Sequence, residues 1–412
     1  MKINNSFYEK IFNLMLYFLI IFSTLSYTVH PLGGTLLKYV IGIIIILVSI
    51  LYVRFDKYEW LVGLIIIMVI IPLFLIICGV YDYDMSQNIN FIFLFIYYLL
   101  LVICLSNFYK NSITKFIRVW QYSLSFVLFI LLLFYKGISL EVGYLLNLTL
   151  SNTRYGNDLL VQRYGMGFLN VNTLALFSTI LLFCSLYSLY KREHIILSLI
   201  DLLGVTVFIL NAESRTPFIL LIFIFITYLI CQIRNLRMRI VFENFLLFLG
   251  IIVSVWFMIL FTIGTNYYYY GALDDLSSHR ISFGTSAFTF LKFDENIWFG
   301  LGPLNTTYIS ETVFGGQLSL DNSIEFYTIT IGILGAILIF GYLFYLFYKV
   351  NMSTSKIGFI TASFYFVYSF FENTIFLPNS MVSVFCLTII FIILRDSVYD
   401  KTTTYNYYDY LQ

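Results

Sequence analysis

The sequence predicts an all-α integral membrane protein that crosses the bilayer many times. Three observations support this class: 60% of the 412 residues are hydrophobic, only 11% are charged, and the mean hydropathy is +0.91. A soluble domain carries roughly 25% charged residues. Lipid offers the backbone no hydrogen-bond partners, so apolar stretches of this kind are expected to be helices. The net charge of +1 gives no electrostatic basis for a nucleic-acid partner.

Twelve apolar segments approach the length of about 17–25 residues that spans a bilayer. The first has no small-residue cleavage site near Thr28, so we expect a retained helix rather than a signal peptide. We expect a single integral membrane domain over residues 1–412. The predicted spans are 11–29, 36–53, 60–80, 89–105, 116–135, 167–190, 195–211, 216–233, 243–264, 324–348, 357–372 and 380–394.

The basic residues orient these spans. With both termini in the cytoplasm, sixteen of the 23 Lys and Arg residues fall in cytoplasmic segments, as the positive-inside rule requires. Cations kept outside need a partner, and a lipid-linked phosphate suits so apolar a chain. The seven external basic residues are Lys38, Lys136, Arg154, Arg163, Arg215, Arg280 and Lys292.

Two external loops are long enough to carry function, over residues 136–166 and 265–323. In the first, Arg154 and Arg163 precede Asn170 and Asn172 at the mouth of the next span. Polar groups at such a helix mouth suit a sugar or a pyrophosphate. The alternative is that the arginines reach lipid phosphates while the asparagines join helices.

A short external turn, "NAESRTPF", holds Glu213 and Arg215 close to the membrane. Pro217 favours a helix start there, and a helix N-terminus attracts anions. We favour a functional role for Arg215, because a guanidinium at this depth needs a partner. The alternative is a tight turn closed by contact between Glu213 and Arg215.

In the second long loop, Arg280 and His279 could grip a phosphate, although a lone histidine is more often a surface group. Asp321 and Asn322 precede the next predicted span. Asp321 could act as a general base or simply cap the helix. Glu372 lies at the outer end of the eleventh predicted span.

The motifs give no support for a metal or a cofactor. The acidic turn from Asp82 to Asp84 has no accompanying His or Cys cluster, and there is no P-loop, dinucleotide fingerprint or nucleophile elbow. We therefore expect charge neutralisation by arginine rather than by a divalent cation.

Five blocks, in their order and spacing, resemble the Wzy/O-antigen polymerase and O-antigen ligase family. They are Arg154 with Gly165, "GFLNVNTLA", "SRT" at 214–216, "WFGLGPLN" at 298–305 and "DNSIEFYTITIGILG" at 321–335. The resemblance covers roughly residues 150–375. It implies a GT-C-like membrane enzyme that joins undecaprenyl-diphosphate-linked oligosaccharides outside the cytoplasmic membrane, as in capsule, exopolysaccharide or O-antigen synthesis, together with membrane lipids and a chain-length regulator as partners.

Ligases of this family often carry a histidine where this chain has Asp321, which favours the polymerase branch. The expected activity is an inverting, metal-independent glycosyl transfer. Arg215 and Arg280, helped by Arg154 and Arg163, would neutralise the diphosphate leaving group. Asp321 is the first candidate base, with Glu213 and Glu372 as alternatives, while Asn170, Asn172, His279 and Asn322 are candidate substrate contacts. A ligase and a flippase for lipid-linked saccharides remain alternative functions.

Overall fold

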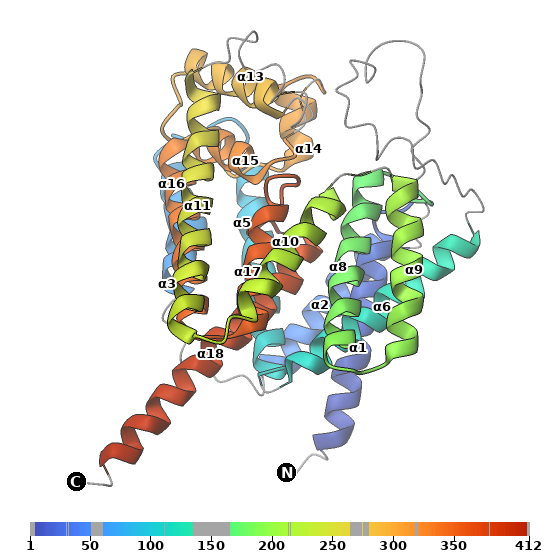
Figure 1. Cartoon of the computed structure of the whole chain (residues 1–412). Coiled ribbons are helices and arrows are strands. Elements are labelled where there is room, and N and C mark those ends of the chain that lie inside the picture. Colours follow the sequence, from blue (N-terminus) through green and yellow to red (C-terminus); the bar gives the residue numbers. More distant parts are fainter. Residues whose placement is uncertain are drawn as a thin grey trace. The chain divides into compact units, whose positions relative to one another are not determined.

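The computed structural model describes residues 5–29, 31, 33–50, 61–110, 112–134, 165–212, 214, 216–263, 274, 280–316, 318, 320–378 and 380–409. The regular elements among these residues are helices, and one isolated bridge pairs Thr28 with Phe168. Figure 1 shows their arrangement. The helices are α1 (Asn5–Leu25), α2 (Gly34–Ile50), α3 (Leu61–Ile65), a π-helical turn (Ile66–Ile70), α4 (Ile71–Ile77), α5 (Met85–Phe108), α6 (Ile113–Phe134), α8 (Val171–Tyr190), α9 (Ile195–Ala212), α10 (Thr216–Cys231), α11 (Leu236–Ile263), α13 (Arg280–Phe293), α14 (Thr306–Tyr308), a second π-helical turn (Ile309–Val313), α15 (Ser323–Thr330), α16 (Gly332–Met352), α17 (Lys356–Tyr368) and α18 (Met381–Asp409).

Seven of the described helices are long and apolar enough to cross a membrane. They are 8–25, 85–108, 113–134, 172–190, 195–212, 236–260 and 332–352, and shorter apolar helices cover 34–50, 61–77, 216–231 and 381–395. These helices confirm, for the described residues, the prediction of a helical membrane protein with several spans. The full set of twelve spans stays a prediction.

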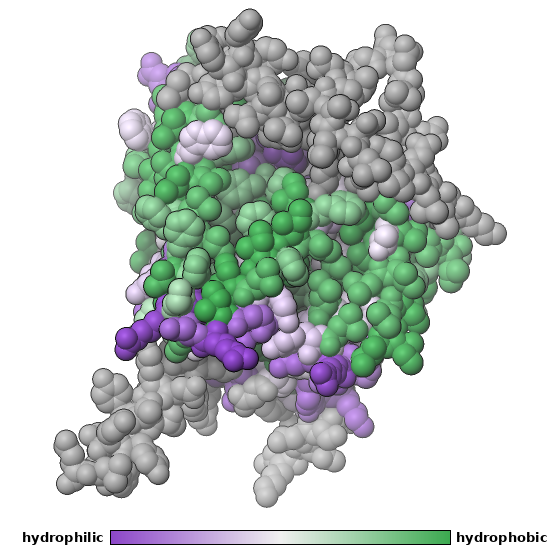
Figure 2. Space-filling view, in the orientation of Figure 1, coloured by the Kyte–Doolittle hydropathy of each residue, from purple (hydrophilic) through white to green (hydrophobic). Residues whose placement is uncertain are grey.

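The helix α11 shows what faces the lipid. Only 22% of the most apolar 18-residue stretch of this helix is buried inside the protein. Val241, Phe245, Phe248 and Ile252 are exposed at intervals of three and four residues, which places them on one face of the helix. Apolar side chains cover the middle of the helices, and hydrophilic ones gather at their lower ends (Figure 2). Such a surface matches a bilayer rather than water.

The chain divides into two compact units that alternate along the sequence. Unit 1 comprises residues 1–53 and 104–222, and unit 2 comprises residues 54–103 and 223–412. The helices α5 and α10 therefore each begin in one unit and end in the other. Each unit is described by itself below.

Unit 1 is built around a buried carboxylate, Asp201 of α9. Its oxygens accept hydrogen bonds from Gln121 Nε2 at 2.7 Å and Ser125 Oγ at 2.7 Å, both on α6, and from Ser185 Oγ of α8 at 3.3 Å. Ser188 of α8 in turn donates to Gln121 Oε1 at 2.6 Å. Asp201 thus makes polar contacts that join three helices, and its carboxyl oxygens are hydrogen-bonded among apolar side chains.

Ion pairs show which loops of unit 1 share an end. Lys115, just after the loop between α5 and α6, pairs with Glu9 near the N-terminus at 2.5 Å. Arg118 pairs with Glu193, between α8 and α9, also at 2.5 Å. These three segments were predicted to share the cytoplasmic side, and the structure brings them to one end of the unit.

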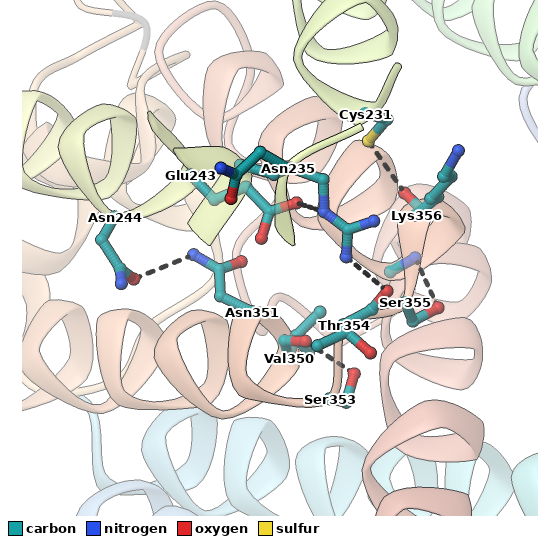
Figure 3. Close-up of polar contacts among 12 residues, drawn as sticks. Cys231, Asn235, Glu243, Asn244, Val350, Asn351, Ser353, Thr354, Ser355 and Lys356 are labelled. Carbon is teal, nitrogen blue, oxygen red and sulfur yellow. Dashed lines mark hydrogen bonds and ion pairs between the residues drawn. The ribbon is translucent and has the colours of Figure 1, made fainter. Parts of the chain in front are cut away.

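In unit 2, polar contacts tie the start of α11 to the junction of α16 and α17 (Figure 3). Arg239 pairs with Glu243 at 3.1 Å and donates to the carbonyl oxygen of Thr354 at 2.7 Å. The thiol of Cys231 lies 3.9 Å from the carbonyl oxygen of Lys356. The loops around residues 234 and 354, both predicted to be cytoplasmic, therefore lie together at what we call the Arg239 end.

The opposite end of unit 2, the Arg280 end, carries α13, α14 and α15 (Figure 1). The predicted external loop 265–323 thus contains helical elements of its own. The predicted single span 324–348 is wrong, since α15 and α16 are separate helices with a break at Ile331 and Gly332. Gly332 has a φ of +71°, a left-handed conformation that interrupts the helical run.

Candidate functional site

A returning segment fills the break between α15 and α16. The N–H groups of Leu301 and Gly302 donate to the carbonyl oxygens of Ile329 at 3.0 Å and Thr330 at 2.7 Å, the last residues of α15. In the other direction, the Ile333 N–H of α16 donates to the Ile297 carbonyl oxygen at 3.1 Å. Backbone groups freed by the break are therefore satisfied, as they must be in an apolar environment.

Glycine is required where this segment meets the break. Gly300 has a φ of +75°, and a Cβ there would lie 2.5 Å from the Gly332 nitrogen. A Cβ on Gly332 would overlap the carbonyl group of Trp298. The block "WFGLGPLN", singled out in the sequence, thus fixes where α15 ends.

The other end of α15 is wrapped by the turn at 369–375. Asn322 caps the helix by accepting the N–H groups of Ile324 and Glu325, and its Nδ2 donates to the Phe370 carbonyl oxygen at 3.0 Å. The Ser323 N–H donates to the Ser369 carbonyl oxygen at 2.9 Å. The N-cap is therefore Asn322, and the alternative that Asp321 caps this helix is wrong.

Ser323 makes a second set of bonds to the same turn. Its Oγ accepts the N–H groups of Thr374 at 2.9 Å and Ile375 at 3.2 Å. The same hydroxyl donates to the Glu372 carbonyl oxygen at 3.3 Å. The side chains at 372–374 are thereby held beside the first turn of α15.

Arg280, the first residue of α13, contacts the turn at 369–375 and lies near the first turn of α15. Its Nη2 donates to the Phe371 carbonyl oxygen at 2.7 Å. Its charge acts on the carboxyl groups of both Glu325 and Glu372, and so does the negative charge of Asp321. These four groups, which we call the Arg280 cluster, come from three separate stretches of sequence.

Two glutamates of the Arg280 cluster favour their neutral forms. Burial, reinforced by the charge of Asp321 and opposed by Arg280, raises the pKa of Glu372 to about 8. The same causes hold the pKa of the Glu325 carboxyl well above its usual range. In its neutral form each carboxyl group can donate as well as accept hydrogen bonds.

The predicted site residues fall into three groups. Arg280, Asp321, Asn322 and Glu372 come together at the Arg280 end of unit 2. Asn170 and Asn172 lie in unit 1, where the Asn170 side chain caps α8 by accepting the Asn172 N–H at 2.8 Å. The remaining predicted residues, Arg154, Arg163, Glu213, Arg215 and His279, lie outside the described residues.

Sequence reasoning gave no role to Glu325, which the structure places in the cluster. A signal was available, because Glu325 follows Asp321 by four residues inside an otherwise apolar run. Among the described residues, no group of three or more His, Cys, Asp and Glu side chains has an arrangement that could hold a metal ion.

Neither the protein-family models nor the curated proteins give a match to this chain. The chemistry of the Arg280 cluster is therefore the basis for assigning a function.

Proposed function

We propose that this protein is a glycosyltransferase of the cytoplasmic membrane, a polymerase that joins undecaprenyl-diphosphate-linked oligosaccharide repeat units. The product would be a capsule, an exopolysaccharide or an O-antigen. One observation carries the proposal. A guanidinium and three carboxyl groups from three stretches of sequence gather at the end of unit 2 opposite to the basic Arg239 end, which the charge pattern predicts to be cytoplasmic.

The reaction needs a base and an anion-stabilising group. The oxygen of an acceptor hydroxyl forms a bond to the anomeric carbon of the donor sugar, and the bond from that carbon to the diphosphate oxygen breaks. The electron pair leaves with the diphosphate, whose growing negative charge Arg280 would stabilise. The hydroxyl proton passes to a carboxylate of the site.

Asp321 is the better candidate for that base. Glu372 holds its own proton at neutral pH, because its pKa is raised to about 8. A carboxyl group that is already protonated cannot take a second proton, so we assign Glu372 the role of hydrogen-bond donor. Asn322 positions Asp321 by fixing the start of α15.

The rest of the proposal follows the resemblance described above. Arg154, Arg163 and Arg215 would add positive charge around the diphosphate. A GT-C-like arrangement of twelve spans, an outward-facing site and cytoplasmic termini belong to the same proposal. Membrane lipids and a chain-length regulator are the expected partners.

The test uses a strain that lacks the chromosomal gene and carries plasmid copies of single variants. Arg280→Ala and Asp321→Asn should each reduce long-chain polymer by about 100-fold, the usual effect of removing one such group. Arg237→Ala is the matched control, because Arg237 is an exposed arginine at the Arg239 end. The readouts are the glycan ladder on a gel and the amount of protein in the membrane.

Full-length polymer in both site variants would overturn the proposal. Polymer of normal length that is no longer attached to its carrier would indicate a ligase instead. Accumulation of lipid-linked repeat units on the cytoplasmic face would indicate a flippase.

A further inference from the structure

Glu325 occupies a position where a glutamate normally completes a helix cap. Asn322 is the N-cap and Glu325 is three residues further on, the spacing at which a glutamate side chain reaches back to the N-cap N–H. Here that reciprocal bond is absent, since neither carboxyl oxygen of Glu325 has a hydrogen-bond partner among the described residues. The Glu325 side chain is therefore not used for capping.

Leaving this carboxyl group without a partner costs stability. Glu325 is 0% exposed, and a buried unsatisfied polar group destabilises a protein by about 1–3 kcal/mol. The residues around Ser323 show the same property. Both side-chain polar atoms of Asn373 and the Oγ1 of Thr374 are buried without a partner among the described residues. Native proteins keep few such groups, and each needs an explanation.

These unsatisfied atoms belong to one place in the fold. Ser323 binds the N–H of Thr374 at 2.9 Å and the carbonyl oxygen of Glu372 at 3.3 Å, so the stretch 372–374 is fixed beside the first turn of α15. Glu325 lies in that same turn. A carboxyl group and an amide group are thus held on two neighbouring elements, next to Arg280 and Asp321.

We propose that Glu325 and Asn373 form a buried subsite that hydrogen-bonds hydroxyl groups of a sugar. The proposal rests on the function proposed above and names the part of the site that holds the glycan rather than the diphosphate. A sugar hydroxyl both donates and accepts, and an amide group and a neutral carboxyl group do the same. Asn373 and Glu325 can therefore each bind a hydroxyl without leaving an unpaired charge.

The electrostatic surroundings keep Glu325 in this neutral form. The charged groups acting on it are Arg280 from α13 and Asp321 immediately before α15, and Arg280 also acts on Glu372 and Tyr368 at the end of α17. Burial and Asp321 together outweigh Arg280, so the pKa of Glu325 lies well above its usual range. In the neutral form that these surroundings favour, the carboxyl group can donate a hydrogen bond to the glycan.

The test compares Glu325→Leu and Glu325→Gln in detergent-purified protein. The substrate is the lipid-linked repeat unit extracted from a strain that lacks this gene. Glu325→Leu should raise KM by at least about tenfold, the effect of losing roughly 1.4 kcal/mol of binding, with a smaller change in kcat. Glu325→Gln, which still donates and accepts, should retain most of the activity. Glu311→Leu is the matched control, since Glu311 is exposed and lies outside the Arg280 cluster.

Thermal unfolding of the same samples separates a binding role from a structural one. Glu325→Leu should unfold at the same temperature as the wild type or higher, because it removes an unsatisfied group. A Glu325→Leu protein with wild-type KM would overturn the subsite, as would one that loses stability together with activity. Loss of activity in Glu325→Gln equal to that in Glu325→Leu would also overturn it. If the wild-type protein does not elongate repeat units at all, the proposed function itself fails.

Discussion

Two buried carboxyl groups, one in each unit, differ in how they are hydrogen-bonded. Asp201 of unit 1 accepts three hydrogen bonds from α6 and α8. Glu325 of unit 2 has none among the described residues, although both side chains are 0% exposed. A satisfied carboxylate joins helices, whereas an unsatisfied one is retained against stability. The contrast supports the proposal that unit 2 keeps its acid for a ligand, whereas the acid of unit 1 joins helices.

The largest effect on stability should come from breaking the satisfied network. Asp201→Leu removes the acceptor that Gln121, Ser125 and Ser185 share and breaks the polar link between three helices, so we expect a loss of about 2–4 kcal/mol. Chemical unfolding in detergent measures it, with Asp201→Asn as the conservative comparison. Equal stability of Asp201→Leu and the wild type would remove the structural role assigned to unit 1.

A change at the helix break should have the next largest effect. Gly332→Ala combines a positive φ with an overlap on the Trp298 carbonyl group, so we expect a loss of about 2 kcal/mol and reduced polymer. Gly341→Ala is the matched control, because nothing lies within 4 Å of a Cβ at Gly341. If both variants behave alike, the break does not position α15 as described.

Replacing Glu325 should change the free energy of unfolding in the opposite direction from replacing Asp201. Glu325→Leu is expected to gain about 1 kcal/mol, because an apolar side chain of similar size replaces a buried carboxyl group without partners. Unfolding under the conditions used for Asp201→Leu makes the two acids directly comparable. A loss of stability of the size seen for Asp201→Leu would show that the two carboxyl groups are equivalent.

The last expected effect is a gradual dependence of stability on pH. The folded pKa of Glu372, about 8, lies above its ordinary value of 4.5. The stabilisation that comes from keeping the Glu372 carboxyl group protonated in the folded protein is therefore fully present below pH 4.5, and it is lost as the pH rises through about 8. Stability should fall between pH 4.5 and about 8, because there the unfolded chain has released this proton and the folded protein still holds it; the slope is at most about 1.4 kcal/mol per pH unit, the limit for one proton. Glu372→Gln should flatten this decline, whereas Glu311→Gln should leave it in place.

Much of the site could be predicted from local sequence, and its central residue could not. Arg280 was identified because a cation kept outside needs a partner, and Asp321 and Glu372 as candidate bases for the expected reaction. The structure brings these three residues together. Glu325 received no role, because its spacing from Asp321 does not show that its carboxyl group is buried; burial depends on segments distant in the sequence. Asp321 was the residue considered as a helix cap, whereas the structure gives that role to Asn322, whose side chain also binds the 369–375 turn.

The sequence by itself determined the class of this protein, and it predicted which basic segments lie together at one end of each unit. Hydropathy and charge are properties of the segment itself, so both can be read from the sequence without knowing which other segments lie beside it. The tertiary structure alone decided that one predicted span is two helices and that the Glu325 carboxyl group has no hydrogen-bond partner in the part of the chain that the structure describes. Both depend on groups distant in the sequence: the 297–302 segment that fills the break, and the turn at 369–375 that holds the first turn of α15. Whether a buried acid is satisfied is set by what the fold brings beside it, which no local pattern records.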